Sequence, residues 1–481
     1  MIVRLLVLLL PVLFAEALQA QSVRVTGSTS LRYIEVRPFV TDSVLLNEVG
    51  GTGILRQTPE GRVVRCVQGA TWCRGTRPAD PVSTIPMTQD LEFSAWGFGE
   101  GVRAFAHLRG RTAWGGNPDL WPRAEDDFDL LAAYGEMTRD RYRVRAGRQW
   151  TTSGLGFYNF DGVSLLVRPR SDLSVEGSAG RSLVRGLNEP RTGGALEAID
   201  ALAPIEPGLM LTGQVRYRPS PNLALTGLYH RDVRDDRAGL YAELARVEGV
   251  VRHAGGSLEA SMERDLAGGA FNELRVRVRT PPVLSSVAAL EVRRYRPYFE
   301  LWTIWGAFSP VGFDEGRAEV TWARARGDLI LRGDVAYRSY DDTGMETSVG
   351  SFRTDGWAVG GHANWSPRDF WRVEGSYRME VGFGAARSEG QLGVRRSLDR
   401  GHVAARGVAF QRLYEFRLDH GVVVGLGAEA GLDVADRSRL IIDVASYRHL
   451  DQGDAPDMDW NQLRASLRLR WTVGAEPGAN P

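Results

Sequence analysis

Histidines are the side chains of this chain that could serve as acid, base or metal ligand. There are seven, spread along its length: His107, His230, His253, His362, His402, His420 and His449. No two of them have the spacing of a metal-ligand pair, and none lies in a recognisable catalytic motif. We therefore expect no catalytic residue, no metal and no cofactor. We expect the histidines to line the interior of the fold or to lie in loops.

The densest group of carboxylates is the run Glu125-Asp126-Asp127-Phe128-Asp129. Carboxylate oxygens in such a run could bind Ca²⁺. We prefer the simpler interpretation of a solvated loop. The whole chain has 59 basic and 59 acidic residues, and every basic residue is arginine. This balance argues against nucleic-acid binding, which normally needs a basic excess on one face.

The N-terminus has the pattern of an export signal. Arg4 precedes the apolar run Leu5–Phe14, and small residues lead to an expected cleavage site after Ala20, with Ala17 as the alternative. The apolar run has about ten residues, whereas a membrane-spanning helix needs about 20. We therefore expect residues 1–20 to be a signal peptide.

The two cysteines, Cys66 and Cys73, lie close together in the segment RCVQGATWCRG. In an oxidising compartment outside the cytoplasm, a local disulfide is the default for such a pair. Closing so short a loop contributes about 2–3 kcal/mol in the chain-entropy model. A haem attachment would need Cys-x-x-Cys-His, which is not present. We expect a structural disulfide and leave a redox or docking role as the alternative.

Polar and apolar residues alternate with a period of two along the whole mature chain. Clear examples are residues 141–146, 275–279, 372–381 and 464–471. This period is typical of β-strands that have one apolar and one polar face. Many of the runs reach about nine residues, the length that a tilted strand needs to cross a membrane. The pattern predicts a transmembrane β-barrel of a bacterial outer membrane.

Turn sequences such as 218–222 and 398–401 separate the runs at short intervals. Counting the runs predicts an all-β fold, a single antiparallel barrel over residues 21–474 with about 22 strands and a range of 18–26. Residues 475–481 are expected to form a C-terminal tail. Two long loops interrupt the barrel, 41–86 with both cysteines and 184–208 with a short helix. Either loop could fold into the lumen or cover the barrel from outside.

One stretch carries a more specific pattern, Gly147-Arg148-Gln149 followed by Phe160-Asp161-Gly162. It resembles the pairing of consecutive strands in porin and alginate-export-type barrels. The resemblance covers residues 146–163 and implies a porin-like barrel, without naming a solute.

If the apolar face of each strand meets lipid, the charged face lines the lumen. An arginine that faces lipid at the bilayer midplane costs about 2–4 kcal/mol. Rings of charge set ion selectivity, and the inward charges here are mostly arginine. An alternative is that arginine and glutamate pair between strands and brace the wall. The predicted pore-lining residues are Arg141, Arg143, Arg145, Arg275, Arg277, Arg279, Arg372, Glu374, Arg378, Glu380, Arg464, Arg468 and Arg470.

These features favour a channel for passive passage of small polar or anionic solutes. A second hypothesis is a scaffold or sheath around a partner such as a periplasmic electron carrier, and a third is a barrel enzyme. The expected partners are outer-membrane lipid and small polar solutes or ions, with no nucleic acid. A homo-oligomer and a periplasmic partner are both compatible with the sequence.

Overall fold

The structure is a computed structural model. It describes residues 22–36, 39–53, 55–59, 63–67, 69–78, 80–115, 128–183, 208–234, 239–296, 312–341, 346–347, 350–351, 354–382, 385–414, 420–451 and 460–474. The expected signal peptide, the carboxylates at 125–127, the helix expected in the 184–208 loop and the tail at 475–481 lie outside this part of the chain.

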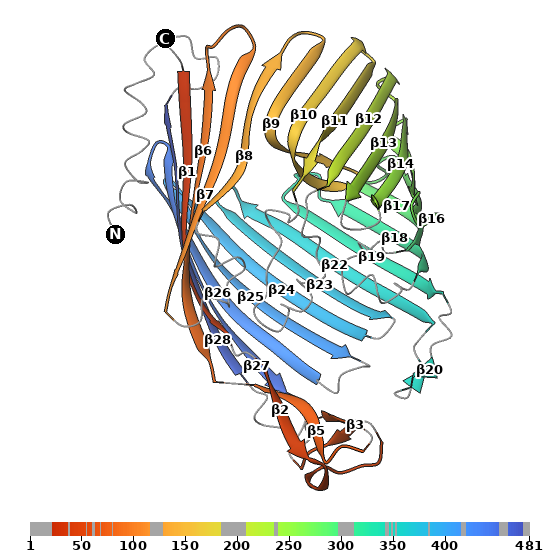
Figure 1. Cartoon of the computed structure of the whole chain (residues 1–481), viewed down its shortest axis with the longest axis vertical. Coiled ribbons are helices and arrows are strands. Elements are labelled where there is room, and N and C mark those ends of the chain that lie inside the picture. The colour runs from red at the N-terminus through yellow and green to blue at the C-terminus, as the bar shows by residue number, and fades with distance from the viewer. Residues whose placement is uncertain are drawn as a thin grey trace.

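Twenty-two antiparallel strands close into one barrel (Figure 1). Each barrel strand pairs with the next along the chain, and the last strand, β28, pairs with β1 from Arg24↔Gly474 to Ile34↔Arg464. The ring therefore has no free edge, as a membrane-spanning sheet requires. The predicted all-β class and strand number are confirmed.

The barrel strands are β1 (Ser22–Val36), β6 (Val82–Trp96), β7 (Val102–Trp114), β8 (Phe128–Thr138), β9 (Tyr142–Ser153), β10 (Gly156–Arg170), β11 (Leu173–Ser182), β12 (Leu209–Ser220), β13 (Leu223–Arg234), β14 (Gly239–His253), β15 (Gly256–Asp265), β16 (Ala270–Arg279), β17 (Ser286–Tyr295), β18 (Phe313–Ala323), β19 (Leu329–Tyr340), β22 (Asp355–Arg368), β23 (Trp371–Gly382), β24 (Ala385–Leu398), β25 (Gly401–Tyr414), β26 (His420–Ala435), β27 (Ser438–Asp451) and β28 (Trp460–Gly474). The short strands β20 (Glu346–Thr347) and β21 (Gly350–Ser351) pair with each other between β19 and β22.

The connections differ in length between the two ends of the barrel. The end that holds the start of β1 and the end of β28 has only short turns, such as the two residues 171–172. The other end holds the connections 37–81, 183–208 and 296–312. Bacterial barrels have short periplasmic turns and longer extracellular loops. The short-turn end is therefore periplasmic and the long-loop end is extracellular.

The connection between β1 and β6 folds into a small sheet of its own. Its strands are β2 (Phe39–Leu45), β3 (Leu55–Gln57), β4 (Val63–Cys66) and β5 (Trp72–Pro78), in the order β2-β5-β4-β3, with the 3-10 turn η1 (Leu46–Glu48) after β2. Figure 1 places this sheet beyond the extracellular end of the barrel, outside the ring of strands. The range 41–86, expected to be a loop, thus includes this sheet and the first residues of β6.

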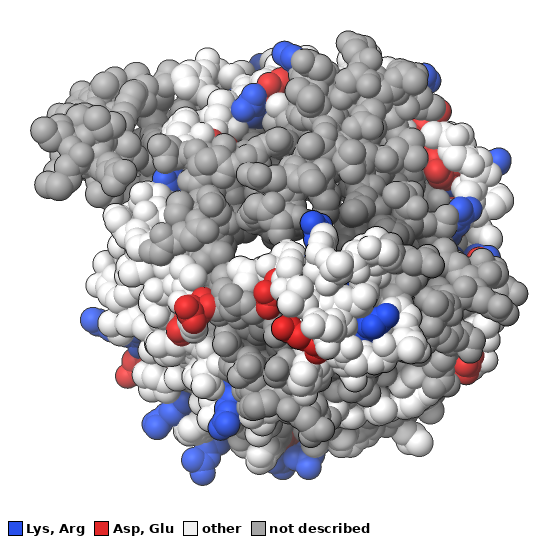
Figure 2. Space-filling view, turned by 60° about the horizontal axis from the view of Figure 1, so that its bottom comes forward, with Lys and Arg blue, Asp and Glu red and all other residues white. Residues whose placement is uncertain are grey.

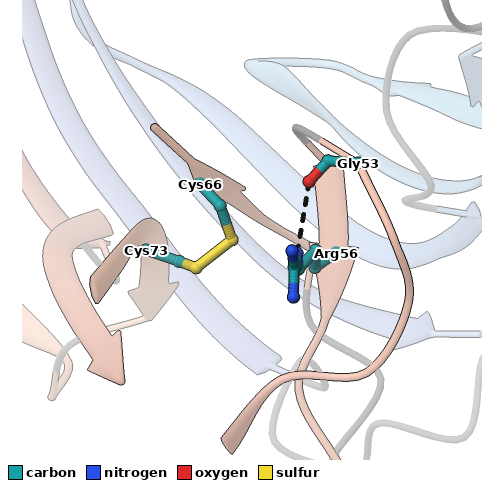
Figure 3. The surroundings of a disulfide bond; sticks show 4 residues. All are labelled: Gly53, Arg56, Cys66 and Cys73. Atoms are coloured by element: carbon teal, nitrogen blue, oxygen red, sulfur yellow. Dashed lines mark hydrogen bonds between the residues drawn. A yellow bond between two sulfur atoms is a disulfide. The ribbon is translucent and has the colours of Figure 1, made fainter. Parts of the chain in front are cut away.

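The predicted disulfide is confirmed, and it joins Cys66 on β4 to its register partner Cys73 on β5 (Figure 3). Both cysteines are buried in the core of the small sheet, together with Val49 and Val64. On the neighbouring strand β3, the Arg56 side chain donates a hydrogen bond to Gly53 O over 3.2 Å. The disulfide therefore crosslinks the extracellular sheet and leaves the barrel wall unconstrained.

The two faces of the barrel wall differ in polarity, as the alternation predicts. On β16, Val276 and Val278 are 47% and 46% exposed on the outside. The alternate residues, Arg275 and Arg277, project to the inside, where each lies within ion-pair distance of Glu291. Val292 on β17 continues the apolar exterior. No helix among the described residues is long and apolar enough to cross a membrane.

Candidate pore and inner hairpin

The register places twelve of the thirteen predicted pore-lining residues on strands, on the side opposite the exposed apolar side chains. These are Arg143 and Arg145 on β9, Arg275, Arg277 and Arg279 on β16, Arg372, Glu374, Arg378 and Glu380 on β23, and Arg464, Arg468 and Arg470 on β28. Arg141 instead lies in the periplasmic turn before β9. That the twelve line a solute path remains a prediction.

Ion pairs follow one another along the inner face from β14 to β24, and we call this set the charged ladder. Arg246 on β14 contacts Glu263 and Glu273 over 3.1 and 2.8 Å. Arg277 lies 3.6 Å from Glu319 on β18. Since these three contacts join neighbouring or next-neighbouring strands, the ladder braces the wall in the way cross-strand charge pairs do.

Glu315 on β18 is the most enclosed acid of the charged ladder. Its side chain is 1% exposed and accepts a hydrogen bond from Arg338, while Arg317 and Arg293 lie 3.3 and 3.7 Å away. Arg338 also pairs with Glu380 on β23. Glu315 was not among the residues predicted from the sequence. Alternation assigns it to the inner face, but only the register shows that three arginines meet there.

The inner face of β9 is paired in the same way. Arg145 donates two hydrogen bonds to Glu136 on β8, over 3.0 and 2.7 Å. Arg103 on β7 reaches the same carboxylate over 2.7 Å. Arg143 lies 3.2 Å from Glu176 on β11. Carboxylates of the barrel wall therefore neutralise much of the charge of Arg143 and Arg145, two of the predicted pore-lining residues.

The wall between β28 and β1 is different. Arg468 and Arg470 lie opposite Ser30 and Ser28 of β1, so no carboxylate faces them across the strand pair. Among the described residues no ion pair is found for Arg24, Arg468 or Arg470. The inward arginines of these two strands form what we call the arginine row: Arg24, Arg32, Arg464, Arg468 and Arg470.

Within this row the positive charges lie close enough to act on one another. The guanidinium of Arg32 is repelled by the like charges of Arg468 on β28 and Arg109 on β7. Arg464 donates a hydrogen bond to the neutral Gln462 over 2.8 Å and lies 5.1 Å above the Tyr447 ring. A mobile anion would relieve this repulsion, because Coulomb energy falls when opposite charge approaches.

The hairpin of β9 and β10 leaves the wall part-way along its length. Pairing between β8 and β9 ends at Ala133↔Arg148, although β8 stays paired with β7 as far as Phe128. The β9–β10 pairing itself continues to Ser153↔Gly156. Figure 1 shows the hairpin curling across the inside of the barrel. We call residues 149–160 the inner hairpin.

Contacts at the tip show where the inner hairpin ends. A Cβ at Gly154 would lie 2.9 Å from Oε1 of Glu248 and 3.0 Å from Cδ1 of Leu228, which are on the inner faces of β14 and β13. Tyr158 stacks on His230 of β13 with ring centroids 3.7 Å apart. Strand β14 is five positions away from β9 around the ring. The hairpin therefore spans a chord of the lumen.

A row of glycines lies where the hairpin bends. Gly147, Gly162 and Gly180 are register partners on β9, β10 and β11. Gly147 has φ +126°, a conformation that favours glycine. A Cβ at any of the three would collide with the backbone of a neighbouring strand. The bend thus requires glycine at these positions.

The side chain of Gln149 fills the space above this glycine row. It donates to Gly162 O over 3.0 Å and accepts from the Ser164 hydroxyl over 2.8 Å. It is 1% exposed. A buried amide with both ends satisfied holds the hairpin against the wall.

Arg148 and Asp161 close the other side of the bend. The guanidinium donates to both oxygens of Asp161, over 2.7 and 2.8 Å, and to Leu130 O over 3.2 Å. Leu130 lies in the part of β8 that no longer pairs with β9. Arg148 therefore supplies a hydrogen-bond donor to a backbone carbonyl that the strand pairing leaves without one. The six motif residues singled out from the sequence therefore all lie at the bend.

In the tilted view toward the extracellular end, Asp and Glu side chains and a basic side chain lie around a hollow of the surface (Figure 2). Within the described part of the chain, no group of three or more His, Cys, Asp or Glu side chains is arranged to hold a metal ion.

Comparisons with known proteins give structural likeness only. No protein-family model matches the chain, and no curated protein matches it. Among solved structures it is similar to a BenF-like porin from Pseudomonas fluorescens Pf-5, with 9% identity, 95% of this chain and 100% of that chain covered, and a TM-score of 0.42. It is also similar to OccAB1 of Acinetobacter baumannii, with 10% identity, 95% of this chain and 97% of that chain covered, and a TM-score of 0.40. A third similar structure is the P pilus usher (PapC) translocation pore, with 9% identity, 94% of this chain and 100% of that chain covered, and a TM-score of 0.43. Likeness at this level identifies no solute.

The class follows from the barrel itself. A closed ring of 22 antiparallel strands has an apolar exterior, a charged interior, short turns at one end and long loops at the other. These features define a porin-like β-barrel of the bacterial outer membrane.

Proposed function

We propose that this barrel is a channel for the passive passage of small polar solutes, with a preference for anions. The observation that carries the proposal is the pair Arg468 and Arg470 of the arginine row, for which no ion pair is found among the described residues. On the opposite wall, arginines of the charged ladder have carboxylate partners, whereas Arg468 and Arg470 face serines. Unneutralised charge on one side of a water-filled lumen attracts ions of the opposite sign.

A second basic region supports the same preference at the periplasmic end. A cavity of about 350 Å³ lies on the inner face there, lined by Arg143, Arg168, Arg216, Arg218 and Glu176, among others. Arginines outnumber acids in this cavity. An anion that follows the arginine row would thus meet positive charge again before it leaves the lumen.

The test is the reversal potential of the refolded mature protein in a planar bilayer under a KCl gradient. We expect stepwise channel openings and a reversal potential shifted toward the equilibrium potential of chloride, as anion preference requires. The variant Arg468→Gln/Arg470→Gln should reduce this preference about fourfold, since one charge at roughly 10 Å in water changes the energy of an ion by about 0.4 kcal/mol, a factor of about two.

Arg396→Gln is the matched control, because Arg396 lies on the outer face against Trp371 and Phe370. It removes charge from the lipid side and should leave the reversal potential unchanged. Cation preference, or an equal effect of the two variants, would contradict the proposal. Absence of any conductance from folded protein would favour the sheath hypothesis instead.

A further inference from the structure

We infer that the inner hairpin is the size-limiting element of this channel and confines solutes to the side of the lumen that carries the arginine row. The inference rests on the proposed function, because a size limit matters only in a lumen that conducts. It concerns a different segment from the two long loops, 41–86 and 184–208, either of which the sequence left free to fold into the lumen or to cover the barrel from outside.

The first support is burial inside the barrel. Met210 on β12 and Leu244 on β14 project inward, yet they are only 1% and 4% exposed. Phe160, at the base of the inner hairpin, is fully buried. Inward side chains that border an open aqueous lumen are exposed to water. The inner face of β10–β14 is therefore covered at the level of the inner hairpin, above the cavity at the periplasmic end.

The second support is that the hairpin is held at both sides. On one side Trp150 lies edge-on to Phe105 of β7, with centroids 6.2 Å apart. On the other side the tip meets Glu248, next to Arg246 at the start of the charged ladder. A segment fixed at its base by the glycine row and at its tip by β13 and β14 has a defined position.

The third support is the distribution of these contacts around the ring. In the part of the chain that the structure describes, the inner hairpin contacts β7 through Trp150, β11 through the pairing Phe160↔Ser182, and β13 and β14 through Tyr158 and its tip. The arginine row lies on β28 and β1, outside this arc. Passage is thus left beside the row, where the charge proposed to select anions is concentrated.

The test is to shorten the hairpin and measure conductance. Replacing residues 151–158 by Asn-Gly joins the register partners Trp150 and Asn159 through a two-residue turn that suits a β-hairpin. The eight strands from β7 to β14 span the arc that the hairpin closes. Removing the hairpin should let these strands border the open lumen as well, and the open cross-section grows with the number of strands that border it. Single-channel conductance should therefore rise roughly 1.5-fold, and larger polyethylene glycols should enter the lumen.

The control removes extracellular material that lies outside the ring. Replacing residues 39–78, the small sheet with the disulfide, by a short Gly-Ser linker should leave conductance and polymer exclusion unchanged. Folding of each variant is established by far-UV circular dichroism and by heat-modifiable gel mobility.

The outcomes separate the two proposals. A rise in conductance without loss of anion preference supports the inference, and unchanged conductance in the shortened barrel overturns it. A silent wild type that conducts once the hairpin is shortened supports the hairpin as a barrier and overturns the open channel. Silence in both folded proteins overturns both.

A crosslink keeps the inference testable if the shortened barrel does not fold. The pair Gly154→Cys/Leu228→Cys should form a disulfide on mild oxidation, because these two positions are in contact across the lumen. The single variants serve as controls. Absence of the crosslink in the folded double variant would place the hairpin tip elsewhere and overturn the inference.

Discussion

Arg148 and Asp161 face each other across β9 and β10 through two hydrogen bonds, at the level where β8 and β9 separate. The guanidinium has a third acceptor in Leu130 O. A lysine has no planar fork and cannot reproduce this set of bonds. Arg148→Lys should therefore lower the free energy of unfolding by about 1 kcal/mol, since both side chains are partly exposed.

Urea unfolding in lipid vesicles, followed by tryptophan fluorescence, measures this loss. Glu100→Gln is the matched control, because Glu100 pairs with Arg139 at a periplasmic turn and its side chain is 92% exposed. The control should change stability by less than about 0.5 kcal/mol. Equal effects of the two variants would show that the Arg148 pair has no special role at the bend.

The glycine row predicts a position-specific intolerance. In Gly162→Ala the new methyl group would collide with the backbone of β11, whereas at Gly135 on β8 a Cβ meets nothing within 4 Å. We expect Gly162→Ala to cost about 1–3 kcal/mol, as overpacking does. Gly135→Ala should be close to neutral. The yield of heat-modifiable barrel and the urea midpoint give the comparison, and a neutral Gly162→Ala would argue against a tight bend.

The charged ladder predicts which acid matters most for the wall. Glu315→Gln leaves Arg293, Arg317 and Arg338 without their shared carboxylate, and removing one partner of a buried ion pair costs about 3 kcal/mol or more. Glu374→Gln is the control, because Glu374 is 51% exposed and lies 3.9 Å from Arg372. Its loss should stay below about 1 kcal/mol. Urea midpoints that shift equally would contradict this ranking.

The disulfide predicts a local effect. Cys66→Ser/Cys73→Ser should destabilise the small sheet by about 2–3 kcal/mol. Trypsin should then cut after Arg56 or Arg65 faster than in the oxidised wild type. Barrel stability and conductance should not change, because the sheet stands outside the ring of strands. A change in conductance on reduction would place the sheet in the solute path.

The sequence alone was sufficient for the class, the strand number and the disulfide. Alternation over strand-length runs assigns every side chain to one of two faces, because successive residues of a strand point in opposite directions. Long alternating runs with opposite polarity on the two faces then indicate a barrel in lipid. Cys66 and Cys73 are close in the chain, so their pairing needs no knowledge of the rest of the fold.

Only the tertiary structure decided which inward charges are neutralised. Arg275 and Arg468 lie in similar alternating runs, yet Arg275 meets Glu291 over 2.8 Å and Arg468 lies opposite Ser30. The difference depends on the register between strands, which alternation does not specify. The inner hairpin is a second case, since residues 149–160 read as ordinary strand. Its bend arises because Gly147, Gly162 and Gly180 come into one row across three strands, and that row exists only after the strands have paired.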